Sequence, residues 1–233
     1  MGVRPATPLY ACGNGGLGHD GARSHARRVL AADVGDDSRA RFRCRHDGLP
    51  IREIAHIVLS IDDPDPDDPV IERLGDPAWS AWMHENFFTP KNVAELGDAR
   101  SYASRLFDYE GSGRDQLAWV VDRLRVDPAS RSATITTFEP LTDTTYIPCV
   151  SMLDFWAPAG RLELVVYAHS LDFGKKAYGN LVELARLQQL VAVELDLPVG
   201  RLTVHVKSAH VYAPEWELMS RLSSEATAPT GRG

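Results

Sequence analysis

Four stretches of the chain repeat apolar residues with the period of an amphipathic helix. Residues 51–61 place them at positions 51, 54, 55, 58 and 61, which is a helical stripe. Residues 115–126 place four on one face: Leu117, Val120, Val121 and Leu124. Residues 180–195 are apolar on most sides, which predicts a long buried helix. A shorter predicted helix ends near Asn86, with one face formed by Trp79, Trp82 and Met83.

After the second of these helices the period changes to two residues, which is typical of strands. The predicted strands cover residues 133–138, 151–156, 162–167 and 202–206. The turn at 157–160 joins the second strand to the third. Helices and strands therefore both contribute to the predicted core.

The stretches outside these predicted helices and strands are a loop and the two ends of the chain. Residues 62–69 are acidic and rich in proline, which cannot continue a helix, so we expect a solvated loop there. Residues 1–48 follow no clear pattern, and residues 223–233 are expected to fray. No repeat and no linker interrupts the chain, so we expect a single α+β domain over residues 1–233.

Composition and charge exclude several classes of protein. Of the 233 residues 44% are hydrophobic, which is enough for a sizeable core. No apolar run approaches the roughly 18 residues of a membrane-spanning helix. The net charge of −7 argues against nucleic-acid binding, but a few arginines in a pocket would still allow a small anionic ligand.

Cysteine and glycine positions restrict the candidate sites further. Cys12, Cys44 and Cys149 form no CxxC pair, so we expect neither a disulfide framework nor a metal site. The glycine-rich run 11–18 lacks the Lys-Ser/Thr ending of a phosphate loop and is interpreted as a turn. The first thirty residues lack the apolar core of a signal peptide, so we expect a cytoplasmic protein.

Cys149 is the first candidate for chemistry. It follows Pro148 and enters a predicted strand, while residues 167–170 close the strand paired with it. A thiol at a strand end acts as a nucleophile where nearby positive charge or hydrogen-bond donors lower its pKa. The alternative is a buried small apolar residue, and the residues alone leave both open.

Short motifs surround Cys149 in a defined order. From the cysteine onward they are Pro148-Cys149, Gly160-Arg161-Leu162, Ser170-Leu171-Asp172, Asn180 and His210-Val211-Tyr212. Upstream they are the tryptophan-rich segment 79–86, Tyr102, Asp115-Gln116, Asp127-Pro128 and Ser130-Arg131. In order and spacing, over roughly residues 50–217, the chain resembles the thymidylate synthase family.

The resemblance implies a thymidylate synthase-like α+β fold, in which a mixed sheet packs with helices and forms a dimer interface. It also implies catalytic roles for Cys149 and Tyr102. The Cys149 thiolate would add to C6 of a pyrimidine ring, so that C5 attacks the methylene of 5,10-methylenetetrahydrofolate. Tyr102 would help to remove the C5 proton.

The resemblance implies binding residues as well. Asn180 would hydrogen-bond the pyrimidine edge, although its place before an apolar run also suits a helix N-cap. His210 and Tyr212 would contact a sugar hydroxyl. The other implied substrate contacts are Ser170, His169 and Arg131, the last acting from the partner subunit of a homodimer. The implied cofactor contacts are Asp172, Trp79 and Trp82.

Two departures from the family pattern remove positive charge. His169 stands where the family has an arginine before its motif serine, and Ser132 replaces the second member of an arginine pair. Both arginines belong to the family's phosphate clamp, and a bidentate guanidinium is hard to replace. The available substitutes are His169, Lys175 and Lys176.

Two further departures concern proton transfer and closure. Ile57, directly after His56 in the predicted helix 51–61, stands where the family has a catalytic glutamate. Glu53 would replace that glutamate only if the helix were rotated. The closing C-terminal segment of the family is not recognisable in the sequence.

Three functions remain open. The first is a transferase that adds hydroxymethyl or methyl to C5 of a pyrimidine nucleotide or nucleoside. Hydroxymethyl is favoured because a site without the closing segment admits water. The second is the same thiol addition without folate, on another small molecule of a specialised pathway. The third is a non-catalytic nucleotide-binding relative, against which the retained Cys149 and Tyr102 argue.

Overall fold

A mixed β-sheet forms the centre of the computed structural model, which describes residues 42–46, 48–144 and 146–227. The sheet order is β1-β2-β9-β7-β6-β5, with β8 also paired to β9. β7 and β8 run parallel to β9, and the other pairs are antiparallel. The strand bounds are β1 (Phe42–His46), β2 (Leu49–Ile61), β5 (Thr134–Thr136), β6 (Val150–Trp156), β7 (Leu162–Ala168), β8 (Leu171–Asp172) and β9 (Val199–Tyr212). The glycine-rich run 11–18 and Cys12 lie outside the described residues.

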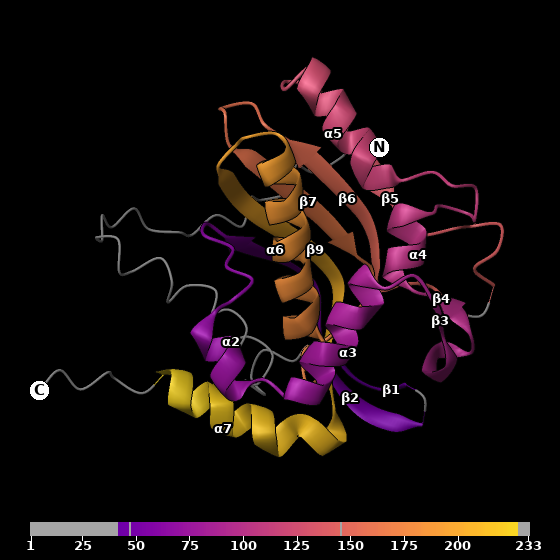
Figure 1. The fold of residues 1–233 in the computed structure, drawn as a ribbon. Coiled ribbons are helices and arrows are strands. Elements are labelled where there is room, and N and C mark those ends of the chain that lie inside the picture. The colour runs from indigo at the N-terminus through magenta and orange to yellow at the C-terminus, as the bar shows by residue number, and fades with distance from the viewer. Residues whose placement is uncertain (1–41, 47, 145, 228–233) are drawn as a thin grey trace, which may run out of the picture.

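Helices cover one face of this sheet. Figure 1 shows α6 crossing that face, with α5 and α3 beside it. The helix bounds are α2 (Pro69–Leu74), α3 (Pro77–Phe88), α4 (Tyr102–Phe107), α5 (Gln116–Val126), α6 (Ala177–Glu194) and α7 (Trp216–Thr227). The short elements are β3 (Asn92–Val93), η1 (Ala94–Leu96), β4 (Ala99–Arg100) and η2 (Ala213–Glu215).

Side-chain caps begin four of the helices. Asp68, Asp76, Ser101 and Asp115 each accept a backbone N–H of the first helical turn. Such caps satisfy donors that have no partner inside the helix. The starts of α2, α3, α4 and α5 are therefore fixed by local sequence.

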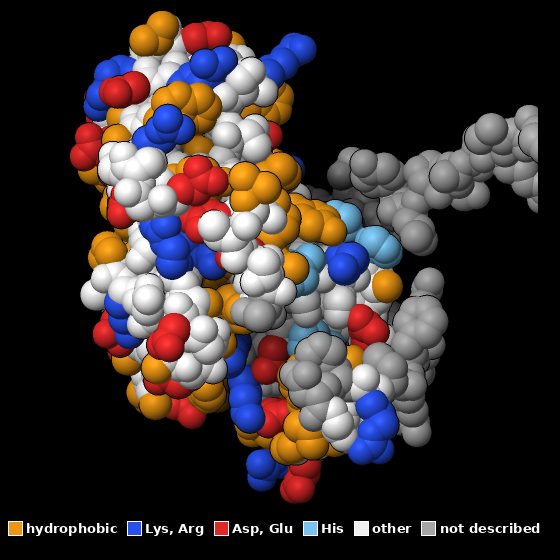
Figure 2. All heavy atoms as spheres, turned by 90° about the vertical axis from the view of Figure 1, so that its right-hand side faces the viewer, with side chains coloured by type: hydrophobic (Ala, Val, Ile, Leu, Met, Phe, Trp, Pro, Cys, Tyr) orange, Lys and Arg blue, Asp and Glu red, His pale blue; other side chains and the backbone are white. Residues whose placement is uncertain are grey.

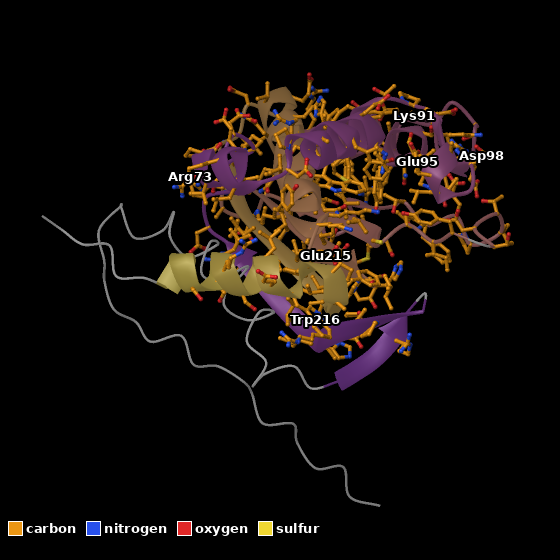
Figure 3. All side chains as sticks on the ribbon, turned by 90° about the horizontal axis from the view of Figure 1, so that it is seen from below. Arg73, Lys91, Glu95, Asp98, Glu215 and Trp216 are labelled. Carbon is orange, nitrogen blue, oxygen red and sulfur yellow. The ribbon has the colours of Figure 1, made fainter. Side chains whose placement is uncertain are left out.

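The last helix, α7, lies at the bottom of the view in Figure 1 and contacts η2. Figure 3 shows Glu215 and Trp216 where η2 leads into α7, beside β2. The Arg52 guanidinium of β2 stacks 4.3 Å from the centroid of the Trp216 ring. α7 continues to Thr227, so the helix includes residues 223–227 of the stretch that we expect to fray.

The structure confirms the predicted α+β class and most elements. α5 buries the four predicted residues, Leu117, Val120, Val121 and Leu124. β5, β6, β7, α6 and β9 lie where helical or alternating patterns predicted them, and α3 contains the predicted tryptophan-rich helix. The stretch 62–68 forms the expected loop, with α2 starting at Pro69.

The prediction of a helix at 51–61 is wrong, because these residues form β2. Ile51 and Leu59 face the core, as the period of two requires. Val58 lies on the opposite face and is 61% exposed. Apolar residues on both faces of one strand produced the false helical stripe. Four isoleucines and a valine in the segment also favour a strand.

The N-cap interpretation of Asn180 is also wrong. α6 begins at Ala177, three residues before Asn180, and Lys176 occupies the cap position. Asn180 therefore lies inside the first turn of the helix, where its side chain is available for another role.

Candidate active site

A cavity of about 700 Å³ opens beside Cys149, which is within the usual range for ligand pockets. Figure 2 shows a hollow on one side of the molecule, with histidine, acidic and basic side chains around it. Nine of the eleven residues predicted for the site line the cavity: Trp82, Tyr102, Cys149, His169, Ser170, Asp172, Asn180, His210 and Tyr212. Trp79 and Arg131 are not among the lining residues.

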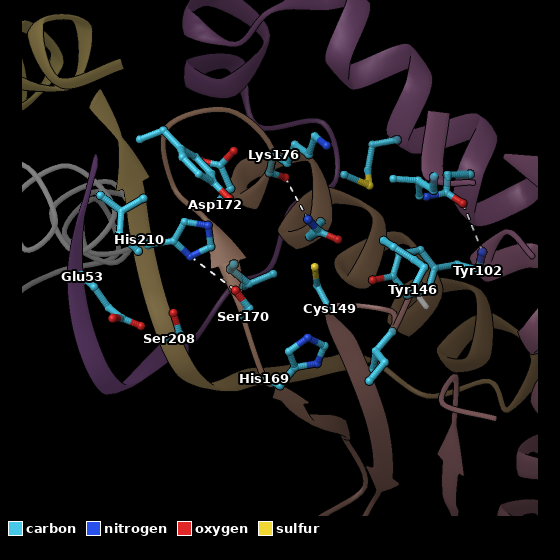
Figure 4. A pocket seen from close by; sticks show the side chains of 18 of the residues that line it. Glu53, Tyr102, Tyr146, Cys149, His169, Ser170, Asp172, Lys176, Ser208 and His210 are labelled. Carbon is cyan, nitrogen blue, oxygen red and sulfur yellow. Dashed lines mark hydrogen bonds between the residues drawn. The ribbon is translucent and has the colours of Figure 1, made fainter. Parts of the chain in front are cut away.

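Cys149 lies directly before β6, at the floor of this cavity (Figure 4). Its carbonyl accepts the His169 N–H at 3.0 Å, which joins the start of β6 to the end of β7. Burial raises the pKa of the Cys149 thiol, and the Asp172 carboxylate raises it further. The positive charge of Lys176 opposes both effects. The thiol therefore lies at the cavity with a raised pKa, and its ionisation depends on nearby charge.

Tyr102 is held on two sides at the start of α4. Its ring stacks on Phe87 with centroids 4.3 Å apart, and its backbone N–H donates to Asn86 Oδ1 at 3.1 Å. The Tyr102 hydroxyl accepts the Val150 N–H at 3.0 Å, one residue from Cys149. Burial raises the pKa of the Tyr102 phenol well above its ordinary value. The phenol therefore stays protonated at neutral pH and can orient a water molecule by hydrogen bonding.

Asn180 presents a buried acceptor without a partner. Its side chain is in a residue only 4% exposed, and Nδ2 donates to the Lys176 carbonyl at 3.0 Å. Because that carbonyl can only accept, it fixes which end of the amide is nitrogen. Asn180 Oδ1 is buried and has no hydrogen-bond partner in the described part of the chain. A buried acceptor in this state can accept an N–H or O–H donor from a ligand or a water molecule.

A second polar group occupies the end of the cavity formed by β9. Ser170 Oγ and His210 Nδ1 are 3.3 Å apart, and the His210 ring meets Tyr212 edge-on with centroids 5.2 Å apart. Glu53 of β2 pairs in register with His210 and lines the same cavity. Figure 4 shows Glu53, Ser208 and His210 on neighbouring strands of this wall. The group offers donors and acceptors suited to hydroxyl groups.

Asp172 and His169 have shifted pKa values for different reasons. Burial raises the pKa of the Asp172 carboxyl, against the opposing influence of His210 and the Gly174 N–H. Burial lowers the pKa of the His169 imidazole, and the Lys207 charge lowers it further. His169 Nδ1 lies 3.2 Å from Ser151 Oγ. His169 is therefore neutral at pH 7 and does not restore the charge of a guanidinium.

A sequence model of the thymidylate synthase family matches residues 53–230. The chain belongs to the thymidylate synthase family. It is similar to proteins of Methanosarcina barkeri and Methanosarcina acetivorans, each named "Putative thymidylate synthase", with 29% and 30% identity over 182 residues. Both alignments cover 75% of this chain and 80% of the relative. The "Thymidylate synthase" of Staphylococcus haemolyticus is 30% identical over 143 residues, 60% of this chain and 45% of that protein.

The thymidylate synthase resemblance had placed the family's glutamate at Ile57, and the structure overturns that assignment. Ile57 lies in strand β2 and does not line the cavity. The helices that line it are α3, which contributes Trp82, Met83 and Asn86, α4, which contributes Tyr102, and α6, which contributes Asn180. Glu85 of α3 instead pairs with Lys91 at 2.8 Å and is half exposed. Among the described residues, the cavity carboxylates are therefore Glu53 and Asp172.

Glu53, Lys176, Tyr146 and Asn86 are lining residues that sequence reasoning missed or left without a clear place. Glu53 was tied to a helix that does not form. Lys176 could have been placed from its spacing, because it precedes Asn180 by four residues and both lie at the N-terminal end of α6. Asn86 ends the tryptophan-rich motif 79–86 but had no role of its own there, and Tyr146 matches no motif and enters the site only through tertiary packing.

Arg131 lies in the loop between α5 and β5 and is exposed. It does not reach the cavity of its own chain. The described residues contain no cluster of three or more histidine, cysteine, aspartate or glutamate side chains that would hold a metal ion. Within the same residues, no helix has the length and apolar content needed to cross a membrane.

Proposed function

We propose that this thymidylate synthase family member transfers a one-carbon group to C5 of a pyrimidine nucleotide or nucleoside. The observation that supports it best is that Cys149 and Asn180 line one cavity, where the buried Asn180 Oδ1 has no hydrogen-bond partner among the described residues. A nucleophile alone would serve many reactions. A nucleophile beside a buried acceptor fits a flat, electron-poor ring that carries an N–H group.

The proposed reaction begins with Cys149. Its thiolate forms a bond to C6, and the electron pair of the C5–C6 double bond moves toward C5 and the adjacent carbonyl. C5 then bonds to the one-carbon unit, whose bond to its carrier breaks, and C5 loses its proton to water. Water adding to the transferred carbon would complete a hydroxymethyl group, whereas a hydride from the reduced carrier would complete a methyl group. Expulsion of the Cys149 thiolate finally restores the double bond. The sulfur is therefore recovered at the end of each cycle.

The other residues bind and orient the substrate in this proposal. Asn180 Oδ1 accepts the N–H of the ring. Tyr102 orients the water molecule that removes the C5 proton. His210, Tyr212 and Ser170 bind sugar hydroxyls. Arg131 and His169 belong to the phosphate side, with Arg131 supplied by the partner subunit.

The residues present also fit a folate cofactor. Asp172 and Trp82 line the same cavity as Cys149, so a flat ring and a polar hydrogen-bonding group would both find a partner there. One Asp172 oxygen accepts the Gly174 N–H at 2.9 Å, which leaves the other available to a ligand. 5,10-Methylenetetrahydrofolate would supply the one-carbon unit. Trp79 lies outside the lining and acts on this site only through its neighbours.

The open face of the sheet supports a homodimer. Val58 of β2, Val165 of β7, and Met152 and Trp156 of β6 are exposed large apolar residues. They belong to the face opposite the helices. A bare apolar sheet face of this kind favours association with a second copy. In such a dimer, Arg131 would act in the partner's cavity.

Release of tritium from C5-labelled pyrimidines tests the proposal. The substrates are dUMP, UMP, dCMP, CMP and their nucleosides, each with and without methylenetetrahydrofolate. We expect release by the native protein, and loss of at least about a thousandfold in Cys149→Ser because the hydroxyl is a far weaker nucleophile. Cys44→Ser, the same substitution at another cysteine, should retain release. Product analysis then distinguishes methyl from hydroxymethyl.

The other outcomes would contradict the proposal in distinct ways. Release that needs Cys149 but no folate would keep the thiol addition and replace the one-carbon transfer with another reaction. Binding of a labelled pyrimidine without any release would favour a non-catalytic relative. Equal release by Cys149→Ser would remove Cys149 from the chemistry.

A further inference from the structure

Lys176, which the sequence offered only as a substitute for a missing phosphate-binding arginine, lines the same cavity as Cys149. Its backbone is fixed on both sides. The Lys176 N–H donates to the Asp172 carbonyl at 3.0 Å, and the Lys176 carbonyl accepts both the backbone N–H and Nδ2 of Asn180. The side chain therefore departs from a rigid point at the start of α6.

Two tryptophans of α3 hold the other end of this side chain. Lys176 Nζ lies 4.9 Å from the centroid of the Trp79 ring and 5.4 Å from that of Trp82. The two rings meet edge-on, with centroids 5.7 Å apart. Both distances are within the range of cation–π attraction. An ammonium group held in this way keeps its position beside the cavity.

We propose that Lys176, held by Trp79 and Trp82, is the cation that stabilises the Cys149 thiolate. The inference rests on the proposed function, in which Cys149 is the nucleophile. Lys176 is then a positioning residue that acts through the sulfur. The tryptophans serve the site by fixing the lysine, which gives Trp79 a role although it does not line the cavity.

The surroundings of Cys149 leave few other cations for this task. Tyr102 from α4 and Tyr146 from the preceding loop are phenols whose pKa values burial raises, so they carry no charge at neutral pH. His169, which follows β7, is neutral. Asp172 of β8 is acidic and opposes ionisation of the thiol.

Arg45 is the other permanent cation among the described lining residues. It lies on β1, two strands away from β9, and its guanidinium donates to the Gly48 carbonyl at 2.5 Å. Lys176 is the positive group that lowers the pKa of the Cys149 thiol against the effect of burial. Lys176 and Cys149 therefore share one cavity, and the lysine charge opposes the effect of burial on the thiol pKa.

Alkylation of Cys149 by iodoacetamide across pH 6–10 tests this inference without any substrate. The thiolate displaces iodide and forms a carbon–sulfur bond, so the rate follows the ionised fraction. Modification is quantified by mass spectrometry on the peptide that contains Cys149, which separates it from Cys12 and Cys44. Circular dichroism confirms that each variant is folded.

The variants separate charge from structure. Lys176→Met keeps the apolar stem and removes the charge. We expect its alkylation midpoint to rise by about one pH unit, with roughly tenfold slower modification at pH 7. Lys176→Arg should keep the midpoint within a few tenths of a unit. Lys175→Met is the matched control, because this neighbour pairs with Glu215 at 2.8 Å and does not line the cavity; its midpoint should not move.

An unchanged midpoint in folded Lys176→Met would overturn the inference. A rise of similar size in both Lys176→Arg and Lys176→Met would also overturn it, since charge would then be irrelevant. Neither result depends on tritium release. A protein that fails every pyrimidine test but shows the expected midpoint shift would lose the proposed function and keep Lys176 as the partner of the thiol.

Discussion

Arg105 is the largest fully buried side chain of the described chain, with an exposed fraction of 2%. Its guanidinium meets the Asp143 carboxylate through two bonds of 2.7 and 2.8 Å. It also donates to the backbone carbonyls of Arg100 and Thr137. These bonds fix α4 to the loop that leads to Cys149. Removing either partner of a buried ion pair strongly destabilises a protein, because the remaining charge is then buried without a counter-ion.

Asp143→Asn should therefore destabilise the protein by roughly 3–5 kcal/mol, because it leaves the Arg105 charge buried without its counter-ion. Urea unfolding measures the change in the free energy of unfolding. Asp122→Asn is the control, since Asp122 pairs with Arg125 at 3.4 Å in an exposed position. We expect that change to cost less than about 1 kcal/mol. Similar losses in the two variants would contradict the assigned role of Arg105.

The sequence predicts site residues well where they belong to one continuous run of motifs. Cys149, Ser170, Asp172 and Asn180 lie within a single hairpin and the helix after it, so spacing along the chain carries over into space. Glu53 could not be placed in the same way, because its position depends on the pairing of β2 with β9. Nor does any spacing rule predict that Lys176 meets two tryptophans a hundred residues earlier in the chain.

At the scale of elements, Gln188 joins α6 to the parallel strands on either side of it in the chain. Its side chain is fully buried, and Nε2 donates to the Leu162 carbonyl at 2.7 Å and to the Gly200 carbonyl at 3.2 Å. The register of β7 against β9 shifts between Leu162 and Leu164. The glutamine amide therefore binds carbonyl groups at the irregular start of this pairing.

Gln188→Ala should destabilise the fold by about 2–4 kcal/mol, since it leaves buried carbonyls unsatisfied and opens a cavity. Thermal unfolding gives the measurement, with circular dichroism as the signal. The neighbouring Gln189 is exposed on the same helix, so Gln189→Ala should change stability by no more than about 0.5 kcal/mol. Equal unfolding temperatures for Gln188→Ala and Gln189→Ala would show that the pairing of β7 with β9 does not depend on the Gln188 amide.

The elements that sequence predicted correctly are those with one buried face. α5 is the clearest example, because its four apolar residues face the core and its other residues face water. β2 could not be recognised in this way. Its two faces both carry apolar side chains, and one of them, bearing Val58, is open in the single chain. Alternation of apolar and polar residues identifies a strand with one buried face. It does not identify β2, because the open face of β2 also carries apolar side chains.

At the scale of the whole molecule, that open face makes a specific prediction about assembly. Val58→Arg should convert the proposed homodimer into a monomer, because an exposed apolar side chain of the proposed contact face becomes charged. Sedimentation velocity gives the molecular mass. Val193→Arg is the matched control, since Val193 is also exposed but lies on α6; it should remain dimeric. A native chain that sediments as a monomer would contradict the prediction.

The α+β class could be predicted from the sequence, because apolar residues repeat with both helical and strand periods and the family motifs imply the same class. The order of strands did not follow, since β9 lies between β2 and β7 and each pairing joins segments far apart in sequence. Assembly is a further step again, because an exposed apolar face can be recognised only after the sheet has been built.

The placement of chemistry along the chain has a consequence for how such proteins diversify. The thiol, its lysine and the amide acceptor all come from residues 149–180. The opposite walls of the cavity come from β2 and α3, which are separate segments. Mutations that accumulate in β2 can reshape what enters the cavity without moving these groups, whereas in α3 Trp79 and Trp82 also hold Lys176. A relative of this protein could therefore keep the reacting groups of residues 149–180 and change its substrate through residues of a separate segment.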